Sequence, residues 1–395
     1  MDAAAFAARL VAEGASPLAV AAARDDVLLV TELLRDGAVA DNGLPAANLT
    51  PLAVACEAGS ARCAAKLIDA KASVNAVDVS HRTPLLAACY SGKPDCAALL
   101  LASGADLAIA DKAGFSPLQM AAQEGNIECI ELLVGHGASA NSISVLVAHH
   151  VVTGEAVRNM ATPLLLAVQH GQEHAVDLLI RLSANVDGIE APGIDSPGSP
   201  LFLSCYQQHN NVTRRLVEAH ADVCRPNAQG SAQGGTPLLA AAQFGDAATV
   251  DLLIQSGAMS SSPAAVTRAL CAASQRGHAA VVELLLRSGA DAEAPDAHGR
   301  TARDCAQERG HLFLLPLFAG TAPQPPDAAE NEVQAAALSA MDTVHNPPAN
   351  ISDAEARQAL SGILQGLQNG SLAFASTDPM SEYDGHGPDV TFGAM

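Results

Sequence analysis

Short apolar stretches, each closed by a glycine or a polar break, recur along this chain at intervals near 33 residues. In the copy over residues 236–258, Thr236 suits a helix N-cap, Pro237 suits the first helical turn, and Gly245 suits the end of that helix. A second apolar stretch with helical spacing follows and stops at Gly257. Helices this short are not stable alone, so the pattern predicts units that pack against copies of themselves.

Nine residues mark the starts of these units. They are Ser16, Thr50, Thr83, Ser116, Thr162, Ser199, Thr236, Arg268 and Thr301, at intervals of 34, 33, 33, 46, 37, 37, 32 and 33 residues. Pro and Leu follow seven of the nine starts, and glycine stands nine residues after seven of them, with Asp25 and Gln208 as the two exceptions. The cap residue, the Pro-Leu pair and the glycine recur at the same positions in successive units, which indicates a repeated fold rather than separate globular domains.

A period near 33 residues with the signature Thr-Pro-Leu resembles the ankyrin repeat. The resemblance implies an all-α solenoid of about nine helix-turn-helix units over residues 1–320, with hairpin loops projecting from the stack. It also implies a protein-interaction module that acts as a scaffold, adaptor or inhibitor through the hairpin tips and the concave face of the first helices. The His that usually follows Thr-Pro-Leu is absent throughout, which predicts a softer stack.

The pattern is most regular early in the array and least regular in its middle. Residues 2–13 predict a lead-in helix that caps the first unit through Phe6 and Leu10. The interval before Thr162 contains about 13 extra residues, and the sixth unit lacks its helix-ending glycine. Because a repeat stack is held by contacts between neighbours, we expect units one to four to fold without the rest. A fragment of residues 1–141 should therefore unfold cooperatively.

The composition changes after the array, whose last helix is predicted to be short and to stop at Pro316. Residues 321–350 are Pro-rich and predict a linker, and residues 371–395 are predicted to be disordered. Residues 351–370 begin with a Ser and, three residues later, a Glu, the spacing of a capping box, and predict an amphipathic helix. Its apolar stripe consists of Leu360, Ile363, Leu364 and Leu367. We expect this stripe to bind a partner, the alternative being that it docks on the stack itself.

The charge of the chain restricts its partners. The formal net charge is −21, from 21 basic and 42 acidic residues, and the segment after residue 320 is acidic. Such a surface repels phosphate backbones and anionic lipid, so neither nucleic acid nor a membrane is an expected partner. No apolar run reaches the length that spans a bilayer. The expected partner is a protein, and the chain itself is expected to be monomeric.

Nine cysteines are odd in number and lack the close Cys-x-x-Cys pairs of a zinc site. Six of them occupy slots where the ankyrin pattern has small or apolar core residues: Cys56, Cys63, Cys89, Cys96, Cys129 and Cys205. We therefore expect buried free thiols. Free thiols and the lack of a basic secretory segment at the start predict a reducing compartment, the cytoplasm or alternatively the nucleus.

Catalytic motifs are not supported by their context. His170 and His174 match the pattern His-x-x-Glu-His, but Gly171 is a helix-ending residue, so the two histidines are expected on different helices. No phosphate-binding loop and no nucleophile elbow are present in the sequence. We expect no catalytic, cofactor-binding or metal-binding residue, so the protein is expected not to be an enzyme. A regulatory subunit acting through its acidic tail helix is the alternative, and an enzyme with a site in the long loops is a weaker one.

Aromatic residues give the candidate binding face. The resemblance places the seventh and eighth residues after each start near the groove, and three aromatic residues occupy those slots: Tyr90, Tyr206 and Phe244. Phe115 lies on a hairpin segment. Large rings are enriched at binding hot spots, although they could instead fill gaps between first helices. The long connections at 142–160, with His149 and His150, and at 188–198, with Ile189 and Ile194, are expected to contact the same partner.

Overall fold

The computed structural model describes residues 3–149, 156–188, 199–227 and 235–319. Its elements are α1 (Ala3–Ala12), α2 (Pro17–Ala23), α3 (Val27–Arg35), η1 (Pro45–Ala47), α4 (Pro51–Ala58), α5 (Ala61–Asp69), α6 (Pro84–Tyr90), α7 (Pro94–Ala102), α8 (Pro117–Glu124), α9 (Ile127–Gly135), β1 (Ser144–His149), β2 (Ala156–Ala161), α10 (Pro163–Gln169), α11 (Glu173–Arg181), α12 (Pro200–Tyr206), α13 (Asn210–Glu218), α14 (Pro237–Phe244), α15 (Ala247–Gln255), η2 (Ala258–Ser260), α16 (Pro263–Arg276), α17 (Ala279–Arg287), α18 (Ala302–Glu308) and η3 (Leu312–Ala319). The tail segments 321–350, 351–370 and 371–395 lie outside the described residues.

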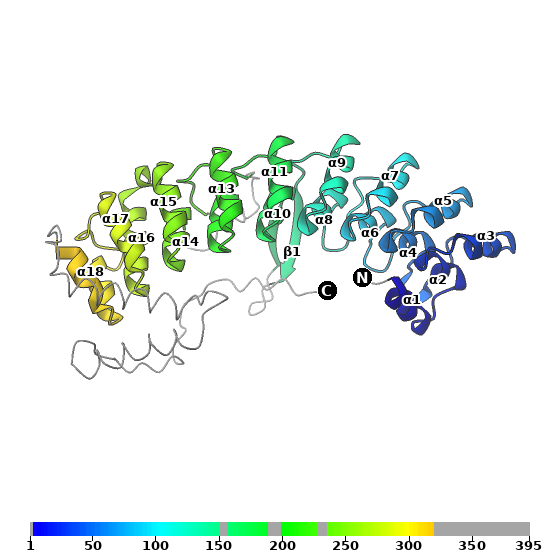
Figure 1. Ribbon diagram of the computed structural model, residues 1–395, viewed down its shortest axis with the longest axis horizontal. Coiled ribbons are helices and arrows are strands. Elements are labelled where there is room, and N and C mark those ends of the chain that lie inside the picture. Colours follow the sequence, from blue (N-terminus) through cyan, green and yellow to red (C-terminus); the bar gives the residue numbers. More distant parts are fainter. Residues whose placement is uncertain (1–2, 150–155, 189–198, 228–234, 320–395) are drawn as a thin grey trace, which may run out of the picture.

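The helices form a curved stack of two layers (Figure 1). The first helix of each unit lines the inner side of the curve. These first helices are α2, α4, α6, α8, α10, α12, α14, α16 and α18. The second element of each unit forms the outer layer. These second elements are α3, α5, α7, α9, α11, α13, α15, α17 and η3. Within the described residues this gives nine units, and the predicted ankyrin-type solenoid is confirmed.

The first helices begin and end as their sequences predict. In α14 the Thr236 hydroxyl accepts a hydrogen bond from the Leu239 amide at 3.2 Å, which satisfies one of the free amides of the first turn. Gly245 ends this helix at φ +75°, in the left-handed conformation that glycine adopts without strain. One predicted start is wrong: α16 is capped by Ser262 and begins at Pro263, so Arg268 lies inside the helix.

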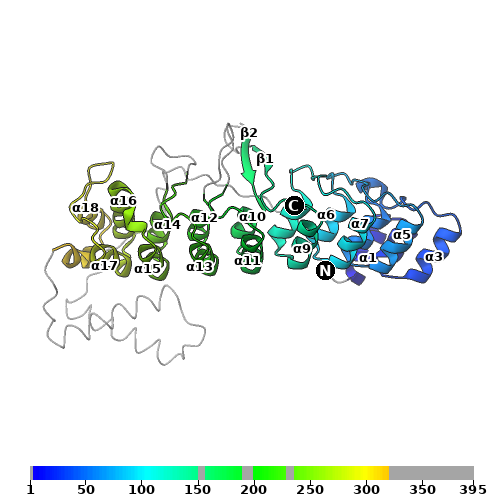
Figure 2. The same cartoon turned by 90° about the horizontal axis from the view of Figure 1, so that it is seen from above.

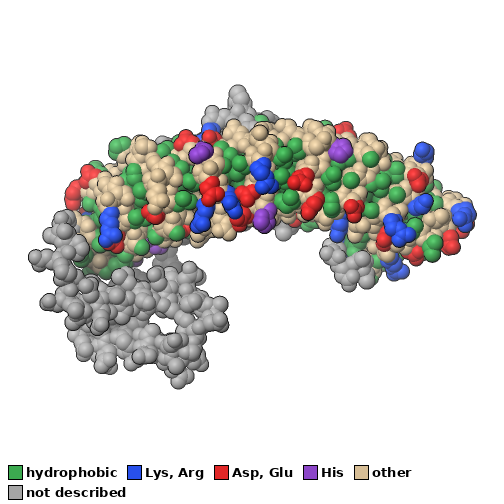
Figure 3. Space-filling view, turned by 45° about the horizontal axis from the view of Figure 1, so that its top comes forward, with side chains coloured by type: hydrophobic (Ala, Val, Ile, Leu, Met, Phe, Trp, Pro, Cys, Tyr) green, Lys and Arg blue, Asp and Glu red, His purple; other side chains and the backbone are tan. Residues whose placement is uncertain are grey.

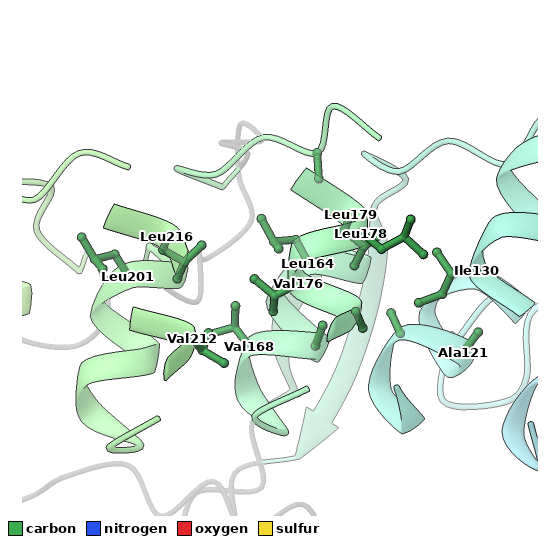
Figure 4. Packing of buried hydrophobic residues seen from close by; sticks show 14 of the residues in the cluster. Ala121, Ile130, Leu164, Val168, Val176, Leu178, Leu179, Leu201, Val212 and Leu216 are labelled. Atoms are coloured by element: carbon green, nitrogen blue, oxygen red, sulfur yellow. The ribbon is translucent and has the colours of Figure 1, made fainter. Parts of the chain in front are cut away.

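Aliphatic side chains fill the space between the layers and between successive units. Leu164, Val176 and Leu201 are buried in one continuous core that joins neighbouring units (Figure 4). Small residues such as Ala121 let the first helices approach one another closely. Because every unit covers an apolar face of the next, the core is a chain of equivalent interfaces rather than one central cluster.

The predicted lead-in helix is confirmed. Helix α1 buries Phe6 and Leu10 against Ala19 and Ala23 of α2, in a small cluster separate from the main core. It therefore covers apolar side chains of the first unit, as a capping element of a repeat stack does.

The long connection before unit five contains a β-hairpin that the sequence pattern did not predict. Strands β1 and β2 pair antiparallel, with Ser144 opposite Ala161 and His149 opposite Ala156, and project beyond the edge of the helical layers (Figure 2). Buried Gln119 attaches the hairpin to the stack: its Nε2 donates to the Ala161 carbonyl at 2.7 Å, and its Oε1 accepts from Ser144 Oγ at 2.6 Å. Independent folding of units one to four stays a prediction, and these bonds show that units four and five are physically joined.

The end of the array also differs from expectation. The last element, η3, is a 3-10 helix with Pro316 inside it, and it continues to Ala319 instead of stopping at the proline. Leu314 and Phe318 are buried there and close the core on this side. In the part of the chain that the structure describes, no helix has both the length and the apolarity needed to cross a membrane.

Candidate protein-binding face

The last two residues before the left-handed residue that ends each first helix form a line along the inner layer, which we call the inner row. Its members are Ala23–Arg24, Glu57–Ala58, Tyr90–Ser91, Gln123–Glu124, Gln169–His170, Tyr206–Gln207, Gln243–Phe244, Gln275–Arg276 and Glu308–Arg309. Most of these side chains are exposed or half-buried. The row therefore presents amides, charges and aromatic rings on the inner side of the curve, while the apolar residues before it face the core.

A ladder of side-chain hydrogen bonds fixes the backbone of the inner row. In units four, five, six and eight the residue before the second helix reaches back to the preceding unit: Asn126 Nδ2 donates to the Tyr90 carbonyl (3.2 Å), Gln172 Nε2 to Gln123 (3.1 Å), His209 Nε2 to Gln169 (3.3 Å) and His278 Nε2 to Gln243 (3.1 Å). Because a carbonyl only accepts, each histidine uses Nε2 as the donor. These bonds couple neighbouring units in a chain whose Thr-Pro-Leu motifs are not followed by a histidine.

Among the described residues no such bond reaches back from units two, three, nine or seven, and unit seven is the one that lies between bonded junctions. The corresponding residue is Asp246, whose carboxylate cannot donate as an ion and instead caps its own helix by accepting from the Thr249 amide at 3.1 Å. An aromatic cluster spans the junction of units six and seven: the Tyr206 ring lies edge-on to Phe244 at 5.6 Å and stacked on Phe202 at 6.0 Å. The rings thus contribute to packing between the units while Tyr206 remains 48% exposed.

The four aromatic residues predicted for the binding face do not form one patch. The structure brings Tyr206 and Phe244 together, whereas Tyr90, 46% exposed, lies in unit three, with units four and five between. Phe115 is half-buried against Ala161 and Leu166 and so supports the attachment of the β-hairpin. Phe202 was not predicted, because it lies four residues before Tyr206, outside the slots that the resemblance marks.

Most of the remaining predicted contact residues cannot be placed. His149 ends β1, but its side chain is not among those described. The other predicted residues lie outside the described residues: His150, Ile189, Ile194, Leu360, Ile363, Leu364 and Leu367.

Toward its end the inner row carries two arginines that the sequence reasoning missed, beside Glu308, which pairs with Arg300 at 3.3 Å. Arg276 and Arg309 occupy the row in units eight and nine and are exposed. The slot that holds Phe244 in unit seven would have identified both of them. On the face shown in Figure 3, in contrast, acidic and basic side chains are interspersed. In the outer layer, Arg215 of α13 forms an ion pair with Asp177 of α11 at 3.5 Å.

The predicted burial of the thiols is confirmed, because eight of the nine free cysteines are buried and only Cys224 is partly exposed. Burial raises the pKa of Cys63, of Cys205 and of Cys271 to about 12. A thiolate is the reactive form of cysteine, so these thiols are unreactive at neutral pH.

One group of possible metal ligands occurs among the described residues. Sulfur atoms of Cys271 and Cys305 and a carboxylate oxygen of Asp296 lie within 4.8 Å of one another. Asp296 already accepts from the amides of His298 and Arg300 at 2.8 and 2.9 Å, and from the Arg300 guanidinium at 2.9 Å. Burial raises the pKa of the Asp296 carboxyl, but these bonds outweigh burial and lower it overall. The carboxylate braces the hairpin bend, beside two neutral thiols.

The histidines of the zinc-peptidase pattern are separated as predicted. His170 ends α10, where its Nδ1 donates to the Leu166 carbonyl at 3.0 Å, and His174 lies in α11. They therefore do not share one helix face, which this zinc chemistry requires.

Fold and repeated caps together define a solenoid of paired helices with an exposed inner face. A family model described as "Ankyrin repeats (3 copies)" matches residues 73–144, 108–190 and 164–264, and one described as "Ankyrin repeat" matches residues 269–297. These matches span more than half of the chain, and the chain belongs to the ankyrin-repeat family. Ankyrin repeats are generally protein–protein interaction modules, and the family is typically non-enzymatic.

The crystal structure of the human ASB11 ankyrin repeat domain is similar to this chain, with 29% sequence identity and a TM-score of 0.48. The similarity covers 61% of this chain and 97% of that domain. No curated protein sequence matches the chain.

Proposed function

We propose that this protein is a scaffold or adaptor that binds a partner protein through the inner row, centred on Tyr206 and Phe244. One observation carries the proposal: Tyr206 joins an aromatic cluster across the junction of units six and seven, yet nearly half of its surface is exposed. An aromatic ring held by its neighbours presents a large contact area at little further entropic cost, which is the property of a hot spot.

The neighbouring residues supply the polar surroundings of such a hot spot. Gln207 and His170 flank the cluster on the row and are exposed. The Gln243 carbonyl is bonded to His278, so the backbone next to Phe244 is fixed before any partner arrives. A preorganised face loses less conformational entropy on binding than a flexible one. The β-hairpin at 144–161 projects beyond the helices and adds a second possible contact.

The proposal is tested by site-specific cross-linking with the full-length chain as bait. A photoreactive amino acid placed at Tyr206 should capture a specific partner protein from cell extract. The matched control places the same group at Arg214, which is exposed on α13 of the same unit but in the outer layer. Capture from position 214 with none from position 206 would contradict the proposed face.

A further inference from the structure

The C-terminal half of the inner row is an aromatic pair followed by two cations with no partner among the described residues. Tyr206, Phe244, Arg276 and Arg309 occupy the row in four successive units, six to nine. In the described part of the chain neither Arg276 nor Arg309 forms an ion pair, whereas nearby Arg300 is held by Asp296 at 2.9 Å. The half-row therefore fits a ligand with acidic groups at one end and an apolar surface at the other.

The chain itself contains a segment with this order of chemistry. After residue 320 it has ten acidic residues and one basic residue. Within the predicted helix of 351–370, Asp353 and Glu355 come first, and an apolar stripe from Leu360 to Leu367 follows. The chain continues from Ala319, beside unit nine, so the acidic end of this segment is the first to return along the row.

The lengths agree with this direction. Adjacent helices pack 8–10 Å apart, so unit six lies about 30 Å from unit nine along the stack. A connection the length of residues 320–351 reaches about 30 Å as a flexible coil, and further where its Pro-rich parts are extended. A helix over 352–367 would be about 24 Å long, enough to cover two unit spacings. The connection is therefore long enough to bring the segment back to the row, the first condition for a high effective concentration.

We propose that residues 352–367 bind the C-terminal half of the inner row of the same chain. Asp353 and Glu355 lie toward Arg309 and Arg276, and the apolar stripe covers Phe244 and Tyr206. At an effective concentration on the order of 1 mM, even an intrinsic Kd of about 0.1 mM keeps the segment bound roughly nine times in ten. The segment then masks the binding face until a partner protein displaces it.

The test uses the full-length chain, which contains no Trp, so that one introduced Trp gives an unambiguous signal. Tyr206→Trp places the probe on the half-row, and Tyr90→Trp gives a matched control of similar exposure in unit three. We expect the probe at position 206 to have blue-shifted emission and weak quenching by acrylamide. Adding Ile363→Asp and Leu364→Asp should shift this emission to the red and increase quenching, while the signal of the control probe at position 90 stays unchanged.

A second pair of tail substitutions controls for added charge. Gln358→Asp and Gln365→Asp add the same charge on the opposite face of the predicted helix and should leave the probe at position 206 shielded. Raising the salt concentration should weaken the shielding, since exposed ion pairs are screened. Circular dichroism confirms that each variant keeps its helices.

Three results would overturn the inference. They are identical emission from position 206 with and without the stripe substitutions, shielding that increases with protein concentration, which indicates a second copy, and tail-dependent shielding only after a partner is added. The inference rests on the proposed function in using the same face, but its readout needs no partner. Failure here leaves the cross-linking result intact, and a failed cross-link leaves the shielding measurable.

Discussion

Removing one rung of the hydrogen-bond ladder should weaken a single junction of the stack. His278→Ala deletes the bond from Nε2 to the Gln243 carbonyl (3.1 Å) and the ring that covers Gly245. A net bond contributes about 0.5–1.5 kcal/mol, and the lost packing adds to it, so we expect a loss of about 2 kcal/mol. His278→Asn keeps a donor of the kind that Asn126 uses and should cost less.

A double-mutant cycle with Gly245 separates the ring contact from backbone strain. A Cβ atom at Gly245 would lie 2.5 Å from His278 Nδ1, and the residue has φ +75°. With His278 present, Gly245→Ala should therefore lower stability through both backbone strain and a clash with the ring. In the His278→Ala background the clash is gone, and Gly245→Ala should lower stability by the strain alone, about 1–2 kcal/mol. The matched control is Gly289→Ala, with φ +96° and nothing within 4 Å of its Cβ position.

Urea unfolding followed by circular dichroism measures both effects, and hydrogen exchange in α14 and α16 locates them at the junction of units seven and eight. His298→Ala, on an exposed hairpin, serves as the histidine control and should change stability by less than about 0.5 kcal/mol. Strict additivity of Gly245→Ala and His278→Ala would refute the ring contact with Gly245. A loss in the His298 control equal to that of His278→Ala would refute the ladder.

Other expectations concern a turn, the thiols and acid stability. Gln208 ends α12 at φ +59°, a strained backbone conformation for any residue but glycine, so Gln208→Gly should raise stability by about 0.5–1 kcal/mol. The control Gln207→Gly, at φ −83°, should lower stability. Thermal unfolding measures both, and a destabilised Gln208→Gly would contradict the strain at this position. Alkylation of the native protein at neutral pH, read by mass spectrometry, should modify Cys224 first; faster labelling of any buried thiol would show that its unit opens. The lowered pKa of Asp296 means that its bonds to Arg300 stabilise the fold above the ordinary carboxyl pKa and are lost as the pH falls below it. Asp296→Asn should therefore lose less stability than the native chain between about pH 5 and pH 3. Equal losses would exclude this carboxyl as a source of the acid sensitivity.

The repeat and its caps could be predicted because each depends on local chemistry. Thr236, Pro237 and Gly245 each satisfy a backbone requirement that is visible in three residue types at fixed spacing. Ser262 could have been found in the same way, since a Pro follows it, but the column of starts pointed to Arg268. Local rules thus describe units well and fail where one helix is longer than its neighbours.

The contacts between units could not be predicted from the same pattern. The ladder position is filled by Asn126, Gln172, His209 or His278, so no single residue type marks it, and only the stacked geometry shows the shared role. The sequence predicts only a long connection at the β-hairpin, because strand pairing depends on a partner strand. The contact of Tyr206 with Phe244 likewise joins residues that are 38 positions apart, in different units.

The central claim is that the cluster of Tyr206 and Phe244 serves binding more than folding. The most direct measurement compares affinity for a captured partner with the thermal midpoint in Tyr206→Ala, using Tyr90→Ala as the control of similar exposure. We predict that Tyr206→Ala weakens binding by about 1–2 kcal/mol, roughly 5- to 30-fold in Kd, with the midpoint nearly unchanged. A large drop in the midpoint with unchanged affinity would show instead that the rings hold units six and seven together.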